Sequence, residues 1–147
     1  MLLFDWFKKW NAPCPASEDR LKILAVSLFV TDRLVLARLG ELHGCELRFT
    51  DSPRAAFSLI AQKHFDLILC NRNQPGYPWR EVVSRLADGS PRSRILLVSP
   101  VSDEYLWRDL VQYGGYDVLP CPVREHDLLQ LMNAEEHVLS HVPGRSL

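Results

Sequence analysis

Short apolar runs alternate along the chain with longer segments whose apolar residues recur at helical spacing. The short runs are rich in leucine, isoleucine and valine, which is typical of strands buried on both faces of a sheet. Strands are expected over residues 21–26, 45–49, 66–70, 94–98 and 116–119. Helices are expected over residues 31–43, 53–63, 79–86, 103–113 and 124–140. Each expected strand is therefore followed by a helix.

Three positions mark helix boundaries within this pattern. Ser52 followed by Pro53 is typical of a helix start, because serine can cap the first turn and proline fits within it. Gly44 is typical of a helix end, since glycine readily adopts the left-handed conformation found there. The helix before Gly44 carries leucine at helical spacing, at positions 34, 36, 39 and 42.

Five strand–helix repeats predict an α/β protein with a doubly wound, five-stranded parallel sheet covered by helices on both faces. The crossovers between parallel strands are expected to be right-handed. Ligands of such folds bind outside the carboxyl ends of the strands, where the strand order reverses. The loops after Val26, Cys70, Val98 and Leu119 are therefore the expected functional region.

Composition narrows the class of protein. The 147 residues carry a net charge of −1, so no overall positive field attracts nucleic acid, and no nucleic-acid partner is expected. Cysteine occurs singly at positions 14, 45, 70 and 121, which indicates reduced thiols and a cytoplasmic location. No apolar run reaches the roughly 20 residues that a membrane span needs.

The chain divides into an N-terminal amphipathic segment with a proline-rich linker (1–20), a main domain (21–142) and a short tail (143–147). In the N-terminal segment, apolar side chains follow helical spacing and share one face: Leu3, Trp6, Phe7 and Trp10. This face can pack on its own domain, on a partner protein or on a membrane surface. Docking on protein is favoured over lipid, because the segment is short and has few cations.

Two longer stretches carry a family resemblance. Residues 65–76 (FDLILCNRNQPG) form a strand that enters a Pro-Gly loop, and residues 114–122 (GGYDVLPCP) form a short strand that ends in prolines. Together with the Val98–Ser99 strand end and the strand–helix order, they resemble a CheY-like response-regulator receiver domain. The resemblance covers residues 22–141. It implies a (βα)5 flavodoxin-like fold, a bacterial origin and a role in two-component (phosphorelay) signalling.

The resemblance also assigns the chemical positions of a receiver. Receivers hold Mg²⁺ with two acids after the first strand and with an acceptor aspartate at the end of the third strand. A hydroxyl and a lysine contact the phosphoryl group, and an aromatic ring reports the switched state. In this chain the acidic pair falls on Ser27 and Leu28, the acceptor on Asn71, the hydroxyl on Ser99, the lysine on Cys121 and the aromatic on Val118.

Only the hydroxyl at Ser99 is retained in kind. We therefore expect no metal site, no cofactor and no aspartyl phosphorylation at position 71, because an amide is not a useful phosphoryl acceptor. Asn71 can act as a permanent uncharged stand-in for aspartate, or it can satisfy backbone groups in a relict pocket. Asp32 and Asp66 are expected outside the pocket, solvated at a helix start and at a strand edge.

Aromatic residues provide candidate partner contacts. Trp79 can cap its helix against the sheet or serve as an exposed anchor, since tryptophan is enriched in interface hot spots. Further candidates are Tyr105, Trp107, Tyr116, Trp6 and Trp10. In receivers, the face made by the fourth helix, fifth strand and fifth helix is the usual partner and dimer surface. The expected partner is a protein, such as a histidine kinase or another signalling protein, or a second copy of the chain.

The sequence thus predicts a stand-alone receiver-like signalling module that is not phosphorylated and is not an enzyme. It would act by protein–protein interaction or by dimerisation. One alternative is a working receiver that is phosphorylated at a non-standard site. Another is a small flavodoxin-like enzyme that uses Cys121 as a nucleophile, with His126 as its base.

Overall fold

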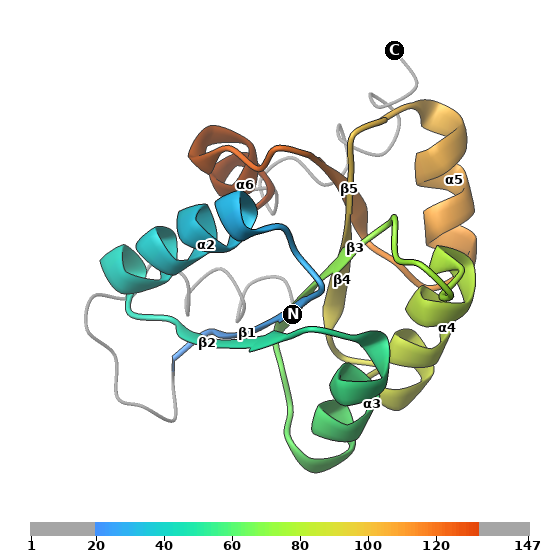
Figure 1. Cartoon of the computed structure of the whole chain (residues 1–147), viewed down its shortest axis with the longest axis horizontal. Helices are drawn as coiled ribbons and strands as arrows, with labels where there is room; N and C mark the ends of the chain where they lie inside the picture. The colour runs from blue at the N-terminus through green and yellow to red at the C-terminus, as the bar shows by residue number, and fades with distance from the viewer. Residues whose placement is uncertain (1–19, 133–147) are drawn as a thin grey trace.

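The computed structural model describes residues 20–132, in which strands and helices alternate as expected (Figure 1). The strands are β1 (Lys22–Val26), β2 (Glu46–Thr50), β3 (Leu67–Asn71), β4 (Arg94–Ser99) and β5 (Asp117–Pro120). The helices are α2 (Val30–His43), α3 (Pro53–Gln62), α4 (Trp79–Gly89), α5 (Glu104–Gln112) and α6 (Glu125–Met132). The predicted N-terminal segment, the tail and the last part of the helix over 124–140 lie outside the described residues.

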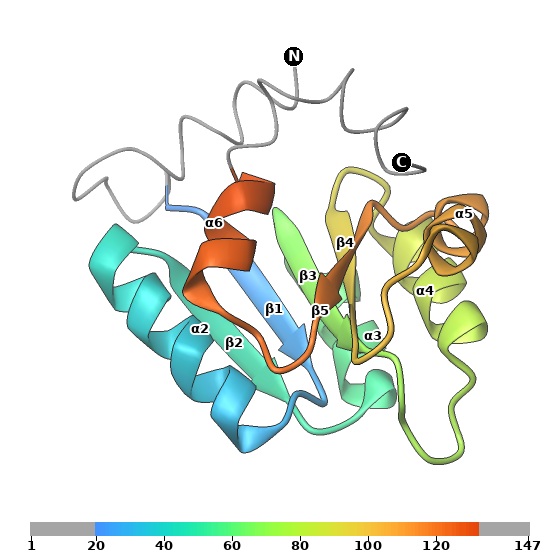
Figure 2. The same ribbon diagram turned by 90° about the horizontal axis from the view of Figure 1, so that it is seen from above.

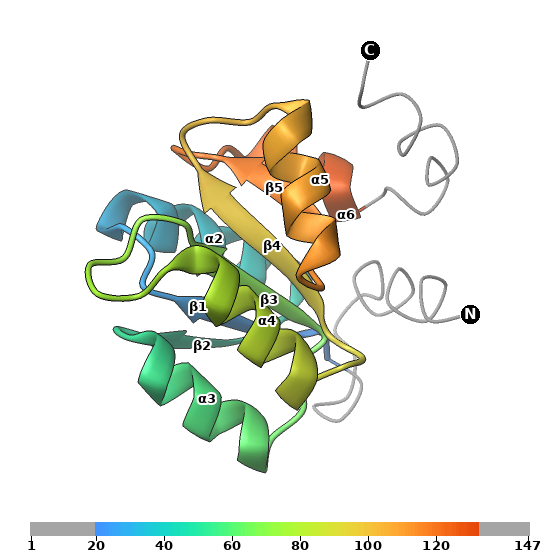
Figure 3. The same ribbon diagram turned by 90° about the vertical axis from the view of Figure 1, so that its right-hand side faces the viewer.

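The strands form one sheet in the order β2-β1-β3-β4-β5, and every pairing between neighbours is parallel. The chain moves outward from β1 to β2, crosses back to β3 and then continues through β4 to β5. Figure 3 shows α3, α4 and α5 in front of the sheet and α2 and α6 behind it, and Figure 2 shows the layers from above. The predicted doubly wound, flavodoxin-like sheet is confirmed.

Two apolar layers hold the helices to the sheet, because neighbouring side chains of a strand point to opposite faces. The layer under α2 and α6 includes Ile23, Ala25, Leu36, Leu39, Leu69 and Leu128. The layer under α3, α4 and α5 includes Leu24, Ile68, Ala56, Val83, Leu97 and Leu110. All five residues of β3 are buried, so this central strand is covered on both faces.

The local signals read from the sequence mark real boundaries. The Ser52 hydroxyl accepts a hydrogen bond of 3.2 Å from the Ala55 N–H at the start of α3. Gly44 ends α2 in the left-handed region, with φ at 67°. The third strand begins and ends one residue later than expected. Asn71 is therefore the last residue of β3, and backbone pairing between the strands continues up to it.

We expect the buried layer under α4 to dominate stability in this part of the molecule. Val83→Ala removes two buried carbon atoms in α4 and should lower the free energy of unfolding by about 2 kcal/mol. Val111→Ala on the exposed side of α5 makes the same chemical change and should stay within about 0.5 kcal/mol of the parent. Urea unfolding of both variants measures the difference. Equal losses would contradict this assignment of the core.

Candidate functional site

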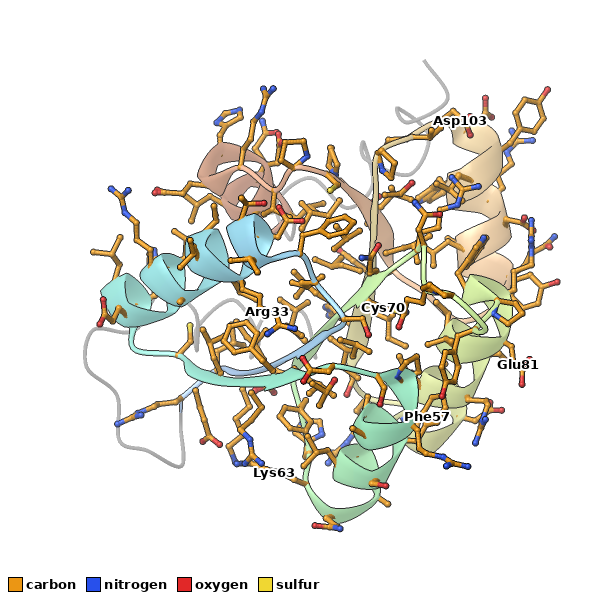
Figure 4. The ribbon with its side chains drawn as sticks, in the orientation of Figure 1. Arg33, Phe57, Lys63, Cys70, Glu81 and Asp103 are labelled. Atoms are coloured by element: carbon orange, nitrogen blue, oxygen red, sulfur yellow. The ribbon has the colours of Figure 1, made fainter. Side chains whose placement is uncertain are left out.

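The candidate site lies where the carboxyl ends of β1, β3, β4 and β5 meet. The sheet register places Val26 opposite Cys70, Asn71 opposite Val98, and Ser99 opposite Pro120. Figure 4 shows the labelled Cys70 near this end of the sheet, with Arg33 reaching from the start of α2. The fold therefore brings the positions expected from the receiver resemblance to one edge.

Asn71 is buried at this edge, and both ends of its side-chain amide are engaged. Its Nδ2 donates a hydrogen bond of 2.9 Å to the Ser27 carbonyl, and its Oδ1 accepts one of 3.2 Å from the Asn73 N–H. The Gln74 Nε2 also donates to the Asn71 carbonyl, at 2.7 Å. The amide thus ties the end of β3 to the loops that follow β1 and β3. This is the backbone-satisfying arrangement that the sequence left as one of two alternatives.

The two positions of the acidic pair have different environments. Ser27 adopts a left-handed backbone conformation, with φ at 57°, and its hydroxyl donates to the Asp51 carbonyl at 3.1 Å. Leu28 is buried and belongs to the apolar layer under α2 and α6. One position is therefore bonded to a neighbouring loop, and the other is part of the hydrophobic core.

Two arginines stand at this edge, and the sequence did not point to either. The Arg72 Nη1 lies 3.4 Å from the Ser99 hydroxyl oxygen. The Arg33 Nε donates to the Leu28 carbonyl at 3.1 Å, and its Nη2 pairs with Asp51 at 2.8 Å. Arg72 directly follows Asn71, so its place next to the acceptor position could have been read from the sequence. Arg33 offered none, because its contacts depend on how α2 packs.

Ser99 retains the hydroxyl of the receiver pattern, but its own loop engages it. The hydroxyl donates to the Val101 carbonyl at 2.7 Å and accepts from the Val101 N–H at 3.1 Å. The side chain is completely buried. Val118, which stands at the aromatic switch position, is buried in the layer under α3, α4 and α5. Neither side chain extends into solvent.

The side chains at this edge do not fit the magnesium ion that the receiver resemblance implies. Mg²⁺ is held by oxygen ligands in proteins, usually with carboxylates among them. Ser27, Leu28 and Asn71 supply no carboxylate, and the polar groups of Ser27 and Asn71 already bond to backbone. Over residues 20–132, no three histidine, cysteine, aspartate or glutamate side chains group in a way that could hold a metal.

Cys121 lies beside a carboxylate that was expected elsewhere. Asp32 is buried: its Oδ1 accepts 2.8 Å from the Val123 N–H, and its Oδ2 lies 3.4 Å from the Cys121 sulfur. The expectation that Asp32 is solvated at a helix start is wrong, because the loop after β5 covers it. Burial and the Asp32 carboxylate both raise the pKa of the Cys121 thiol. This shift opposes formation of the nucleophilic thiolate.

Asp66 lies at the amino end of the sheet, as expected, but it is also buried. Its carboxylate accepts a hydrogen bond of 2.9 Å from the Lys22 N–H and lies 3.3 Å from the His64 Nε2. The prediction of its place is confirmed, while the prediction of solvation is wrong. Asp66 instead satisfies the backbone at the start of β1.

The candidate partner residues fall into two groups. Trp79 is only 6% exposed and packs edge-on against Tyr113, so its expected role as an exposed anchor is corrected to packing. Tyr105 on α5 is 84% exposed. Trp107 and Tyr116 are half-buried. Trp6 and Trp10 lie outside the described residues.

Placing a charge at position 28 should be costly. Leu28→Asp puts a carboxylate into the apolar layer under α2 and α6 and should lower the free energy of unfolding by about 3 kcal/mol or more. Ser27→Asp is the matched control, because this half-buried position has a backbone conformation that aspartate tolerates. Chemical denaturation of both variants tests the difference. Similar small losses would show that position 28 is not committed to the core.

The thiol of Cys121 should react slowly with iodoacetamide near neutral pH, because little of it is thiolate. Asp32→Asn removes the carboxylate charge while keeping an acceptor for the Val123 N–H, so it should lower the pKa and speed alkylation. Below the pKa, each unit of lowering raises the thiolate fraction about tenfold. Peptide mass spectrometry separates Cys121 from Cys45 and Cys70, whose pKa values burial raises to about 12. Faster alkylation in the parent than in the variant would contradict this assignment.

Some known proteins are similar to this chain in sequence or in fold. No family model matches the chain. The chain is 26% identical over 122 residues to the response regulator protein FleR of Pseudomonas aeruginosa. This match covers 81% of the chain but only 25% of the relative, so the chain spans about a quarter of that protein's length.

Within residues 20–132, no helix combines the length and apolar character needed to cross a bilayer.

Solved structures agree on the architecture. The chemotaxis response regulator CheY4 of Vibrio cholerae has a TM-score of 0.67 and 20% identity, over 76% of this chain and 94% of that one. A co-crystal structure from Saccharomyces cerevisiae pairs the phosphotransfer protein Ypd1 with the receiver domain of Ssk1. It has a TM-score of 0.67 and 16% identity, over 76% of this chain and 86% of that one. The chain thus has the CheY receiver fold, and the comparisons support a CheY-like response-regulator receiver domain.

Proposed function

We propose that the chain is a receiver-like signalling module that acts through protein contacts and is not phosphorylated at position 71. The observation that carries this proposal is the environment of Asn71. An amide stands where receivers place the acceptor aspartate, and backbone groups of two loops occupy both of its ends. The residue stabilises the loop arrangement and offers no oxygen anion for phosphoryl transfer.

The electrostatics of the edge support the same proposal. Phosphoryl transfer depends on cation assistance and on a positioned nucleophile. Here the positions that would hold the metal are Ser27 and Leu28, and Leu28 is in the core. Arg33 and Arg72 place guanidinium groups at this edge. The nearby carboxylates of Asp51 and Asp32 are engaged by Arg33 and by the loop after β5, so the added guanidinium charge disfavours a bound divalent cation.

The proposed partner surface lies on α5 and its neighbours. Tyr105 is the most exposed large apolar side chain on this helix. Val111 of α5 and the flanking Val101 and Tyr113 are exposed as well. Aromatic residues on an accessible surface are typical of protein interfaces. Arg80 of α4 pairs with Asp109 of α5, with its Nε at 3.0 Å, so α5 is held firmly against α4. A fixed helix loses little freedom when a partner binds.

We propose a signalling protein as the partner, such as a histidine kinase or a phosphotransfer protein, with a second copy of the chain as the other option. The yeast co-crystal structure pairs a receiver domain of similar fold with a histidine phosphotransfer protein. This supports a protein partner for the module. A cytoplasmic setting, and a role without enzymatic activity, belong to the same proposal.

The two other functions read from the sequence find less support. A nucleophilic Cys121 needs a lowered pKa, whereas burial and Asp32 raise it. A non-standard phosphorylation site needs a carboxylate beside a metal site, and the acids near this edge are otherwise engaged. Asp32 bonds to the loop after β5, and Asp51 pairs with Arg33.

The test is an amide NMR titration of the full chain with Mg²⁺ and then with beryllofluoride, a mimic of the phosphorylated aspartate. We expect no saturable shifts at Ser27, Asn71 or Ser99, and no mass increase of one phosphoryl group after treatment with phosphoramidate. Asn71→Asp should also fail to bind Mg²⁺, because Ser27 and Leu28 still supply no carboxylate. V. cholerae CheY4 serves as the positive control under the same conditions.

Saturable, Mg²⁺-dependent shifts at this edge in the unmodified chain would overturn the proposal. Phosphoramidate labelling that maps to another residue and is lost when that residue is substituted would establish the non-standard receiver instead. Magnesium binding by Asn71→Asp alone would show that the neighbouring positions are less restrictive than their contacts indicate.

A further inference from the structure

Helix α2 has an exposed apolar side as well as a buried one. Leu36 and Leu39 pack against the sheet, as expected for a core helix. Val30, Leu34 and Leu42, however, are 70%, 65% and 68% exposed. With Arg38 they form a row of residues four apart, and such a row lies along one side of a helix. We call this row, Val30, Leu34, Arg38 and Leu42, the outer face of α2.

The outer face of α2 differs from the solvent side of α4. Helix α4 also packs on the sheet, but its solvent side is polar and includes Arg80, Glu81, Arg85 and Asp88. A helix that is apolar on both sides is normally covered on both sides. Within the outer face, Arg38 lies between Leu34 and Leu42 and pairs with Glu125 of α6 at 3.6 Å. Exposed apolar side chains that gather on one side of a helix mark a site of interaction. The outer face of α2 is therefore a docking surface that the described residues leave uncovered.

A notch adjoins the outer face where α2 passes the edge strand β2. Its cavity volume is about 460 Å³, and its lining consists of Ala37, Arg38, Gly40, Glu41, Cys45 and Leu47. Arg38 belongs to both the notch and the outer face. Bulky side chains that lie along the outer face can thus enter a recess at the end of α2.

We propose that residues 2–10 of this chain dock on the outer face of α2 and place an aromatic ring in the notch. The first argument is where the described chain begins. The Glu46 N–H donates to the Leu21 carbonyl at 2.9 Å, and the Cys45 N–H donates to the Gly40 carbonyl at 2.8 Å. The residues that precede Leu21 therefore join the domain beside the notch.

The second argument is reach. The ten linker residues from 11 to 20 span up to about 33 Å when extended. The fourteen residues of α2 rise by about 21 Å along the helix axis. The linker is therefore long enough to bring residues 2–10 to any part of the outer face. As a helix, these nine residues would be about 14 Å long, enough to lie beside both Leu34 and Leu42.

The third argument is chemical complementarity. Residues 2–10 carry an apolar side formed by Leu3, Trp6, Phe7 and Trp10, and this side needs a partner surface of the same character. Tethering favours the chain's own segment, because a short link between two binding groups gives an effective concentration on the order of millimolar. A separate partner must compete against that concentration.

Docking of this segment would cover the outer face of α2. This inference does not depend on the absence of phosphorylation at position 71. It assigns to the N-terminal segment a role as an internal ligand of the domain.

The test compares amide NMR spectra of the full chain and the Trp6→Ser/Trp10→Ser variant. We expect shifts in α2 and in residues 45–47, and unchanged resonances in α5. The reciprocal variant, Leu34→Ser/Leu42→Ser, should shift the indole N–H signals of Trp6 and Trp10 but not that of Trp79. Tyr105→Ser on α5 is the matched surface control and should shift neither Trp6 nor Trp10.

All of the substituted α2 and α5 residues are exposed, so the variants should remain folded. Sedimentation velocity should show a monomer. The chemical-shift differences between the parent and the variants should not change when the protein is diluted. The proposal is wrong if α2 does not respond to the tryptophan substitutions, or if the response maps to α5 or α6. If the chemical-shift differences disappear on dilution and sedimentation velocity shows a dimer, the outer face binds a second copy of the chain instead. Vesicle binding without any α2 response would assign the segment to a lipid surface.

Discussion

The arrangement of this molecule depends on the burial of β3 between β1 and β4. Both faces of β3 are covered, and its side chains alternate between the two apolar layers. A change of register by one residue would exchange these faces and move Asn71 out of its pocket. The parallel pairing also places the ends of three strands at one edge. Asn71 can therefore bond to the Ser27 carbonyl, although the two residues are 44 positions apart in the chain.

The same edge combines the receiver fold with side chains that are engaged by backbone or by the core. Functional sites usually keep polar groups unsatisfied or charges close together, which costs stability. Here Asn71 and Ser99 bond to backbone, and Leu28 joins the core. The guanidinium groups of Arg33 and Arg72 lie at the same edge. The edge is thus a structural junction between loops.

The sequence predicted those features that rest on local signals. Strand and helix order follow from periodicity, and Ser52 and Gly44 mark helix ends through chemistry confined to a few residues. The burial of Asp32 could not be predicted in this way, because its partner Val123 lies 91 residues away and approaches only when α6 packs beside α2. The burial of Trp79 likewise depends on α5 being held over α4. Side-chain partners across the fold are decided by packing, which a single sequence does not display.

Leu28 has a consequence for how this sequence can change over generations. With the proposed receiver assignment, a full set of metal-binding acids would require substitutions at positions 27, 28 and 71, and the one at position 28 falls in the apolar core. Aspartate at position 71 gives no advantage while position 28 remains apolar. Aspartate at position 28 loosens the apolar layer before any advantage appears. A change of this sequence toward a metal-dependent receiver therefore loses core packing at position 28 before a complete set of acids is present.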